Sequence, residues 1–209
     1  MHSILLGMEG EKKPCALGRP RAFCAEDALD RALHVFREKG YEGTSLSDLT
    51  NALGINRPSL YAAFGCKEEL FRKVLARYME SFWAHLTAAM DVPTAREAME
   101  QVLELGLTAL ANPDTPAGCL LVRGALACSA EGEPIRQELN AQRRAWEALL
   151  RTRFERAVRE GDLAADTDCA ALARFYATVS HGLAVQAASG ATPDQMRQVV
   201  QIALRAWPS

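Results

Sequence analysis

The sequence predicts an all-α protein of about nine helices arranged in two domains. Ala and Leu recur throughout the 209 residues and β-branched residues are sparse, a composition that favours helix. Apolar residues repeat at helical spacing, and Gly and Pro divide the chain into segments of helical length. A chain of 209 residues can form two modest domains that share a long element.

The first helix is expected over residues 25–39. Leu29, Ala32, Leu33 and Phe36 repeat there at helical spacing, and Gly40 is expected to end the helix. Residues 1–18 have little apolar periodicity and contain several glycines and a proline. We therefore expect a flexible tail before the first domain.

The second and third helices are joined by a short glycine turn. Ser45 and Asp48 can form a capping box ahead of the second helix, and Gly54 ends that helix. Asn56 can cap the third helix, which tolerates Pro58 because first-turn amides have no partner inside a helix. This layout is a helix-turn-helix, whose second helix enters the DNA major groove by its N-terminal end.

A fourth helix is expected to run from Cys66 to about residue 90 and to bridge the two domains. Further helices are predicted over 94–111, 117–129, 133–160, 167–189 and 192–207, with Thr94, Thr167 and Thr192 as N-caps. The expected organisation is a tail (1–18), a helix-turn-helix domain (19–66), a connecting helix (67–90) and a C-terminal domain (91–209).

One densely patterned run of about 50 residues carries a family resemblance. The run is Phe36-x-x-x-Gly40-Tyr41-x-x-Thr44-Ser45-x-x-x-Leu49-x-x-x-x-Gly54-Ile55-Asn56-x-x-x-Leu60-Tyr61-x-x-Phe64-x-x-Lys67-Glu68-x-Leu70. It resembles the tetracycline-repressor-like (TetR/AcrR) family of bacterial transcription regulators. The resemblance implies a homodimer that binds a palindromic double-stranded DNA operator, most often as a repressor that a small molecule releases. Activation remains an alternative outcome of ligand binding.

The resemblance also implies roles for individual residues. Thr44, Tyr61 and Lys67 would bind phosphates, and Arg57 would be the partner for a guanine edge. A basic arm before the first helix would lie in the minor groove, although it can equally be a solvated tail. The expected DNA-contacting set is Arg19, Arg21, Thr44, Ser45, Asn56, Arg57, Pro58, Ser59, Tyr61 and Lys67.

The C-terminal domain is expected to hold an effector and a dimer face. The expected walls of a largely apolar pocket are Trp83, Leu103, Leu107, Leu120, Arg123, Trp146, Phe175 and His181. The expected dimer face is Leu172, Val179, Leu183, Met196, Val200, Leu204 and Trp207. Alternatively, these apolar residues form intramolecular core, His181 is a hydrogen-bonded core residue and Arg123 forms an internal salt bridge.

A thiol switch is an alternative to a ligand pocket. Cys66 lies beside Lys67 at the start of the fourth helix, where positive potential favours a reactive thiol. Cys119 and Cys128 are further candidates. The alternative interpretation of Cys66 is a tolerated helix cap in a reducing cytoplasm.

Charge and motifs bear on other classes of protein. Residues 19–80 hold ten basic and nine acidic side chains, so charge alone would not predict a DNA-binding protein. No apolar run reaches the length of a membrane span and no secretory signal is evident, so we expect no membrane association and a cytoplasmic protein.

The cysteines and histidines show no metal or disulfide spacing, and the sequence lacks phosphate-loop, H-E-x-x-H and nucleophile-elbow motifs. We expect no metal, no cofactor and no enzymatic activity.

Overall fold

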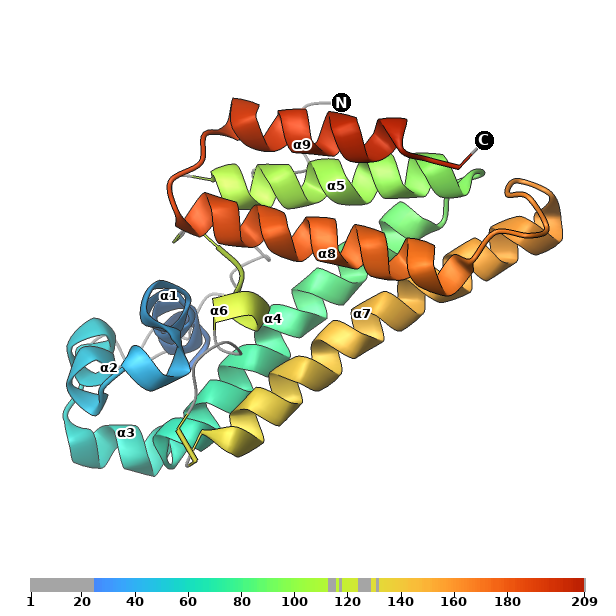
Figure 1. The fold of residues 1–209 in the computed structure, drawn as a ribbon. Coiled ribbons are helices and arrows are strands. Elements are labelled where there is room, and N and C mark those ends of the chain that lie inside the picture. Colours follow the sequence, from blue (N-terminus) through green and yellow to red (C-terminus); the bar gives the residue numbers. More distant parts are fainter. Residues whose placement is uncertain (1–24, 113–115, 117, 124–128, 131, 209) are drawn as a thin grey trace, which may run out of the picture.

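The computed structural model describes residues 25–112, 116, 118–123, 129, 130 and 132–208. All regular structure in these residues is helical. Three helices at one end of the molecule form what we call the head: α1 (Ala25–Gly43), α2 (Leu46–Leu53) and α3 (Arg57–Phe64). The long helix α4 (Lys67–Met90) leads from the head to the rest of the chain (Figure 1).

The other end of the molecule, which we call the body, contains α5 (Ala95–Ala111), α6 (Leu120–Arg123), α7 (Glu133–Glu160), α8 (Cys169–Ala188) and α9 (Pro193–Arg205). Helices α5, α8 and α9 lie side by side, and α7 begins beside the head and runs along α4 away from it (Figure 1). None of the helices in the described ranges is both long and apolar enough to cross a membrane.

Local capping signals set most of the helix ends where the sequence predicts them. Ser45 with Asp48, Thr94 with Glu97, and Thr192 with Gln195 form capping boxes. Gly40 lies at φ 72°, a backbone conformation that favours glycine, and it kinks α1 four residues after Phe36. A short helical turn follows this kink, so α1 extends beyond the predicted end at residue 39.

Two predicted helix ends differ from the structure. The N-cap of α8 is Asp168 and not Thr167, because the Asp168 carboxylate accepts hydrogen bonds from the amides of Ala170 and Ala171. The helix expected over 117–129 begins only at Leu120. Residues 124–128, which include Cys128, lie outside the described part, as do Arg19, Arg21 and the expected tail over 1–18.

The core of the head is completed by residues of the body. Phe36 and Phe71, both fully buried, meet edge to face with ring centroids 5.0 Å apart. The same cluster contains side chains from α6 and α7, namely Leu120, Leu121, Ile135 and Leu139. Each buried aliphatic side chain contributes roughly 1.5–3 kcal/mol. The core of the head is therefore shared with α6 and α7 of the body, and the two regions cannot separate without exposing it.

Polar contacts reinforce this junction. The buried Arg37 of α1 donates from Nη2 to the carbonyl oxygen of Gly118 at 3.0 Å. The Glu42 carboxylate accepts hydrogen bonds from the backbone amide and the hydroxyl of Ser129, at 3.1 and 2.9 Å. Both contacts join α1 to the segments on either side of α6. A shift of these segments would therefore be transmitted to the head.

Candidate nucleic-acid interface

Local hydrogen bonds set the start of α2, the turn that follows it and the start of α3. The Asp48 carboxylate accepts from the Ser45 amide at 2.9 Å, and the Ser45 hydroxyl oxygen accepts from the Asp48 amide at 3.1 Å. Gly54 ends α2 in the left-handed conformation at φ 70°. The Asn56 side chain accepts from the Ser59 amide at 2.9 Å and starts α3. The predicted caps of both helices are therefore confirmed.

Helix α3 has one buried side and one exposed side. Leu60 and Phe64 are buried in the head, with 0% and 4% of their surface exposed. The opposite side carries exposed Arg57, Pro58 and Ser59, and Tyr61 is 48% exposed. A helix that presents its N-terminal side chains on a rigid support has the form of a DNA-recognition helix.

Arg57 is oriented by a residue that the sequence did not single out. Its Nη2 donates to the Ser47 hydroxyl oxygen of α2 at 3.2 Å. The remaining donors of the guanidinium stay available for the paired acceptors of a guanine edge. Ser47 is a positioning residue that no motif marks, because its partner lies on the next helix.

Thr44 differs from its expected role. It is 1% exposed, and its hydroxyl donates to the Gly40 carbonyl oxygen at 2.6 Å. Its hydrogen is thus engaged inside the protein, where it ties the kink of α1 to the start of α2. The expectation that Thr44 presents its hydroxyl to a phosphate is wrong for this structure.

Lys67 and Tyr61 differ in how accessible they are. The Lys67 ammonium lies 4.4 Å from the centre of the Tyr41 ring, a cation–π contact. Burial lowers the pKa of Lys67, and Glu42 opposes this effect. Tyr61 is open to solvent on α3. Tyr61 is therefore open to an outside partner, whereas the Lys67 ammonium is engaged with Tyr41 inside the protein.

An ion pair holds α2 against α1. The Lys39 ammonium lies 2.5 Å from the Asp48 carboxylate. Hydrogen bonds from Lys39 and from Ser45 hold the pKa of Asp48 well below its usual value. The capping box of α2 is thus part of a network that also includes Lys39 of α1.

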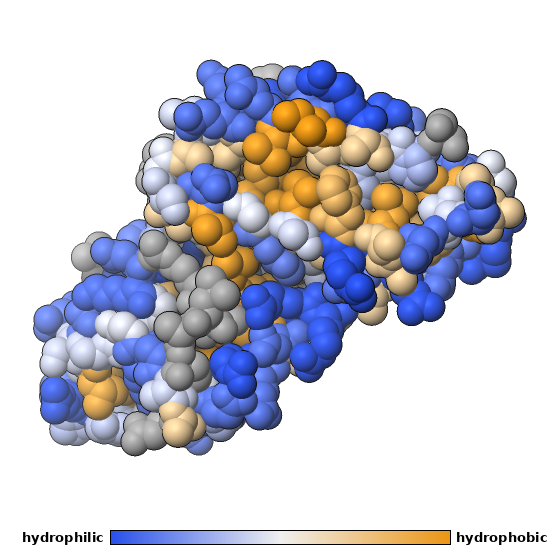
Figure 2. All heavy atoms as spheres, viewed as in Figure 1, coloured by the Kyte–Doolittle hydropathy of each residue, from blue (hydrophilic) through white to orange (hydrophobic). Residues whose placement is uncertain are grey.

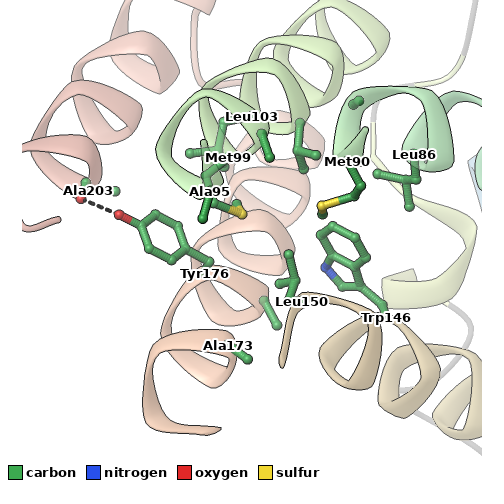
Figure 3. Close-up of a cluster of buried hydrophobic side chains, with 14 of the residues drawn as sticks. Leu86, Met90, Ala95, Met99, Leu103, Trp146, Leu150, Ala173, Tyr176 and Ala203 are labelled. Atoms are coloured by element: carbon green, nitrogen blue, oxygen red, sulfur yellow. Dashed lines mark hydrogen bonds between the residues drawn. The ribbon is translucent and has the colours of Figure 1, made fainter. Parts of the chain in front are cut away.

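The residues expected to line an effector pocket do not enclose one in the described structure. Leu103, Leu107 and Trp146 are packed in the body core, and Figure 3 shows Leu103 and Trp146 in one cluster with Met90 and Met99. The remaining members of the set are dispersed: Leu120 lies in the core of the head, Trp83 contacts both cores, Phe175 is 42% exposed on the surface, and His181 borders an open hollow. The side chain of Arg123 lies outside the described residues.

The expected dimer face also differs from the structure. Leu183, Met196 and Val200 are buried in the core of their own subunit, and Leu172, Val179, Leu204 and Trp207 are partly buried against it. The exposed apolar side chains of α8 and α9 are instead Phe175, Val185, Val199 and Ile202. Figure 2 shows apolar side chains gathered over these two helices. The residues expected to form the dimer face therefore pack against the core of their own subunit, whereas other apolar side chains of the same two helices are exposed.

Tyr176 of α8 joins this helix to α9 inside the body. Its ring is fully buried, and its hydroxyl donates to the Ala203 carbonyl oxygen of α9 at 3.0 Å (Figure 3). Burial raises the pKa of Tyr176 to about 12. The hydrogen bond fixes α8 relative to α9 from the inside.

Two family models match this chain. The family "Bacterial regulatory proteins, tetR family" matches residues 28–74, and "Tetracyclin repressor-like, C-terminal domain" matches residues 95–203. The HTH-type transcriptional repressor ComR of Escherichia coli strain K12 is 34% identical over 195 residues, which cover 91% of this chain and 92% of ComR. The HTH-type transcriptional repressor BdcR of the same strain is 29% identical, over 90% of this chain and 91% of BdcR.

Solved structures agree with these matches. A cysteine mutant of the TetR family transcriptional regulator CifR, complexed with 26-bp double-strand operator DNA, is 46% identical and superposes with a TM-score of 0.87. That match covers 91% of this chain and all of the CifR chain. A TetR regulator from Rhodococcus sp. RHA1 is 43% identical with a TM-score of 0.61, over 88% of this chain and 98% of that one.

The fold and the exposed face of α3 define a helix-turn-helix DNA-binding transcription regulator. More particularly, the chain belongs to the tetR family of bacterial regulatory proteins.

Proposed function

We propose that the chain is a transcriptional repressor that binds a palindromic operator as a homodimer and releases it when a small molecule binds the body. The observation that carries this proposal is the rigidly supported, solvent-facing start of α3, with Arg57, Ser59 and Tyr61 exposed. The names of ComR and BdcR as repressors, and the operator complex of CifR, support it. The expected site of action is the cytoplasm.

The exposed apolar side chains of α8 and α9 support the homodimer. Phe175 and Val185 share one face of α8 with Thr178 and Gly182, since these residues are spaced by three or four positions. Ile202 is 64% exposed on α9. Two copies joined through these helices would form a four-helix bundle with an isologous interface. Two α3 helices could then enter successive major grooves, about 34–36 Å apart.

Release by a small molecule would work through a population shift. A ligand that binds better to a dimer with differently spaced heads lowers the fraction that fits the operator. Because Leu120, Leu121, Ile135 and Leu139 of the body pack in the core of the head, a movement of α6 or α7 would move the head as well. We propose no catalytic activity for this chain. The relatives named above are transcriptional regulators, which supports this part of the proposal.

A thiol switch at Cys119 is the second candidate for the signal. The Cys119 sulfur lies 3.4 Å from the Tyr78 hydroxyl of α4, next to the Gly118 carbonyl that binds Arg37. Oxidation or alkylation there would add bulk at the junction between α4, α6 and α1. Cys66, by contrast, is exposed at the start of α4.

Gel retardation with the DNA upstream of the gene, combined with sedimentation, tests the repressor proposal. Wild type should retard the fragment as a dimer. Ile202→Asp should shift the protein toward monomer and abolish retardation, because a carboxylate would be buried in the interface. Gln201→Asp is the matched control, since Gln201 is exposed on another side of α9. Equal behaviour of the two variants, or a monomer that retards DNA as well as wild type, would refute the proposed dimer.

A further inference from the structure

The body contains an open hollow between α7 and α8 that the family match does not explain, and its rim at Thr178 adjoins the face of α8 proposed for the dimer. Its volume is about 270 Å³, roughly that of nine water molecules. It is lined by Asn140, Arg143, Arg144, Glu147, Ala177, Thr178 and His181. The hollow is distinct from the body core, where Leu103 and Trp146 are already packed.

The charges around the hollow do not cancel. The Glu147 carboxylate is engaged by Arg174, whose Nε lies 3.3 Å away. Within the described part of the chain, neither Arg143 nor Arg144 has an ion-pair partner. Arg143 donates only to the neutral side-chain carbonyl of Asn140. Arg143 and Arg144 therefore both line the hollow, and neither guanidinium forms an ion pair with a carboxylate of the described residues.

The other polar groups at the rim are suited to an anion. The Asn140 oxygen accepts from Arg143, which leaves its amide hydrogens as donors. Burial and the neighbouring Arg143 lower the pKa of His181, and Glu147 opposes this effect. A neutral His181 offers one ring N–H without adding a third charge beside the arginines.

We propose that this hollow binds a small anion that carries carboxylate or phosphate groups. Guanidinium groups bind both through paired, charge-assisted hydrogen bonds. Asn140 and His181 would supply further donors, and the size of the hollow fits a compact ligand such as a tricarboxylate. The site would thus accept a polar anion where the sequence led us to expect an apolar effector.

The position of the hollow on α7 links it to the head. Leu139, directly before Asn140, is fully buried in the core of the head, and Glu138 pairs with Arg72 of α4 at 2.7 Å. A ligand that draws α7 toward α8 would therefore act on the head within one helical turn. This part of the inference rests on the proposed repressor function, whereas anion binding itself does not.

Calorimetric titration of the DNA-free protein tests the binding site. Citrate and inorganic phosphate are titrated separately at pH 7 and at constant ionic strength set with chloride, so that the two anion classes are distinguished. Arg143→Gln combined with Arg144→Gln should weaken binding by about tenfold or more, because the variant cannot form the charge-assisted hydrogen bonds. Arg151→Gln combined with Arg156→Gln is the matched control, since it makes the same charge change on α7 at residues paired with Glu155 and Glu160.

Saturable binding of citrate or phosphate to wild type and to the control variant, but not to the Arg143/Arg144 variant, supports the site. The proposal is overturned if wild type gives no saturable heat, or if the two double variants lose binding equally. It is also overturned if the Arg143/Arg144 variant binds the anions normally but forms a weaker dimer, because the arginines then face the partner subunit. Operator retardation with and without the bound anion is measured separately, so a failure of the repressor function leaves the titration interpretable.

Discussion

The head and the body place their candidate functional residues in different ways. In the head, Arg57, Pro58 and Ser59 directly follow the cap Asn56 on one short helix. In the body, the hollow brings together Asn140 of α7 and His181 of α8, which are far apart in sequence. A contact face set by a local cap can be found in the sequence, whereas a face made by the packing of distant helices emerges only from the structure.

The two regions should nevertheless unfold together, because the core of the head includes side chains from α6 and α7. Phe36→Ala in the head and Phe154→Ala in the body each remove a fully buried ring. Each should lower the free energy of unfolding by about 3–5 kcal/mol. Denaturant melts should show one transition in both variants, and two separated transitions in either would show that head and body are independent.

The next largest effect is expected on the discrimination between operator bases by α3. Arg57→Ala should remove about 1–3 kcal/mol of discrimination at one operator base pair. Binding to operators that already carry another base there should change little. Competition retardation with single-base operator variants measures this, and Arg197→Ala on α9 is the control. A uniform loss across all operators would instead assign Arg57 to the phosphates.

The phosphate-binding residues should behave in the opposite manner. Tyr61→Phe combined with Lys67→Ala should weaken binding to every sequence. Removal of the Lys67 charge should also reduce the salt slope by about one, because one phosphate is no longer neutralised by the protein. Affinities measured between low and moderate salt give this slope. An unchanged slope would mean that Lys67 stays over Tyr41 in the DNA complex and contributes nothing there.

The smallest effect concerns the network between α1 and α2. The folded pKa of Asp48 is depressed, so its stabilising contribution is present above the unfolded pKa and disappears as the pH falls through the folded pKa. Asp48→Asn should therefore lower the Tm at pH 7, and the gap to wild type should narrow as the pH falls below 4. Thermal melts over this pH range measure it, and a gap that is independent of pH would exclude the ionised carboxylate as the cause.

Much of the head followed from short-range rules. The Ser45–Asp48 box, the Gly54 turn and the Asn56 cap involve residues at most five positions apart, so the sequence alone locates them. Thr44 could not be assigned in this way, because its hydroxyl turns inward only as a result of the kink at Gly40.

The body was predicted less completely for a physical reason. Helix periodicity shows which residues share a face, but it does not say whether that face meets the same subunit or another one. Leu183 and Val200 are therefore indistinguishable in sequence from Val185 and Ile202, although the first pair is buried and the second exposed. The arginines of the hollow lacked any motif, since their significance depends on Glu147 being engaged by Arg174.

Selection of binding sites from a random duplex DNA library by the purified full-length protein tests whether α3 reads the operator. We expect enrichment of a palindrome whose half-sites lie about one helical turn apart, and loss of one preferred base in each half-site with Arg57→Ala. Absence of any enriched sequence with the wild-type protein, or the same enriched sequence with Arg57→Ala, would contradict the assignment of α3 as the reading helix.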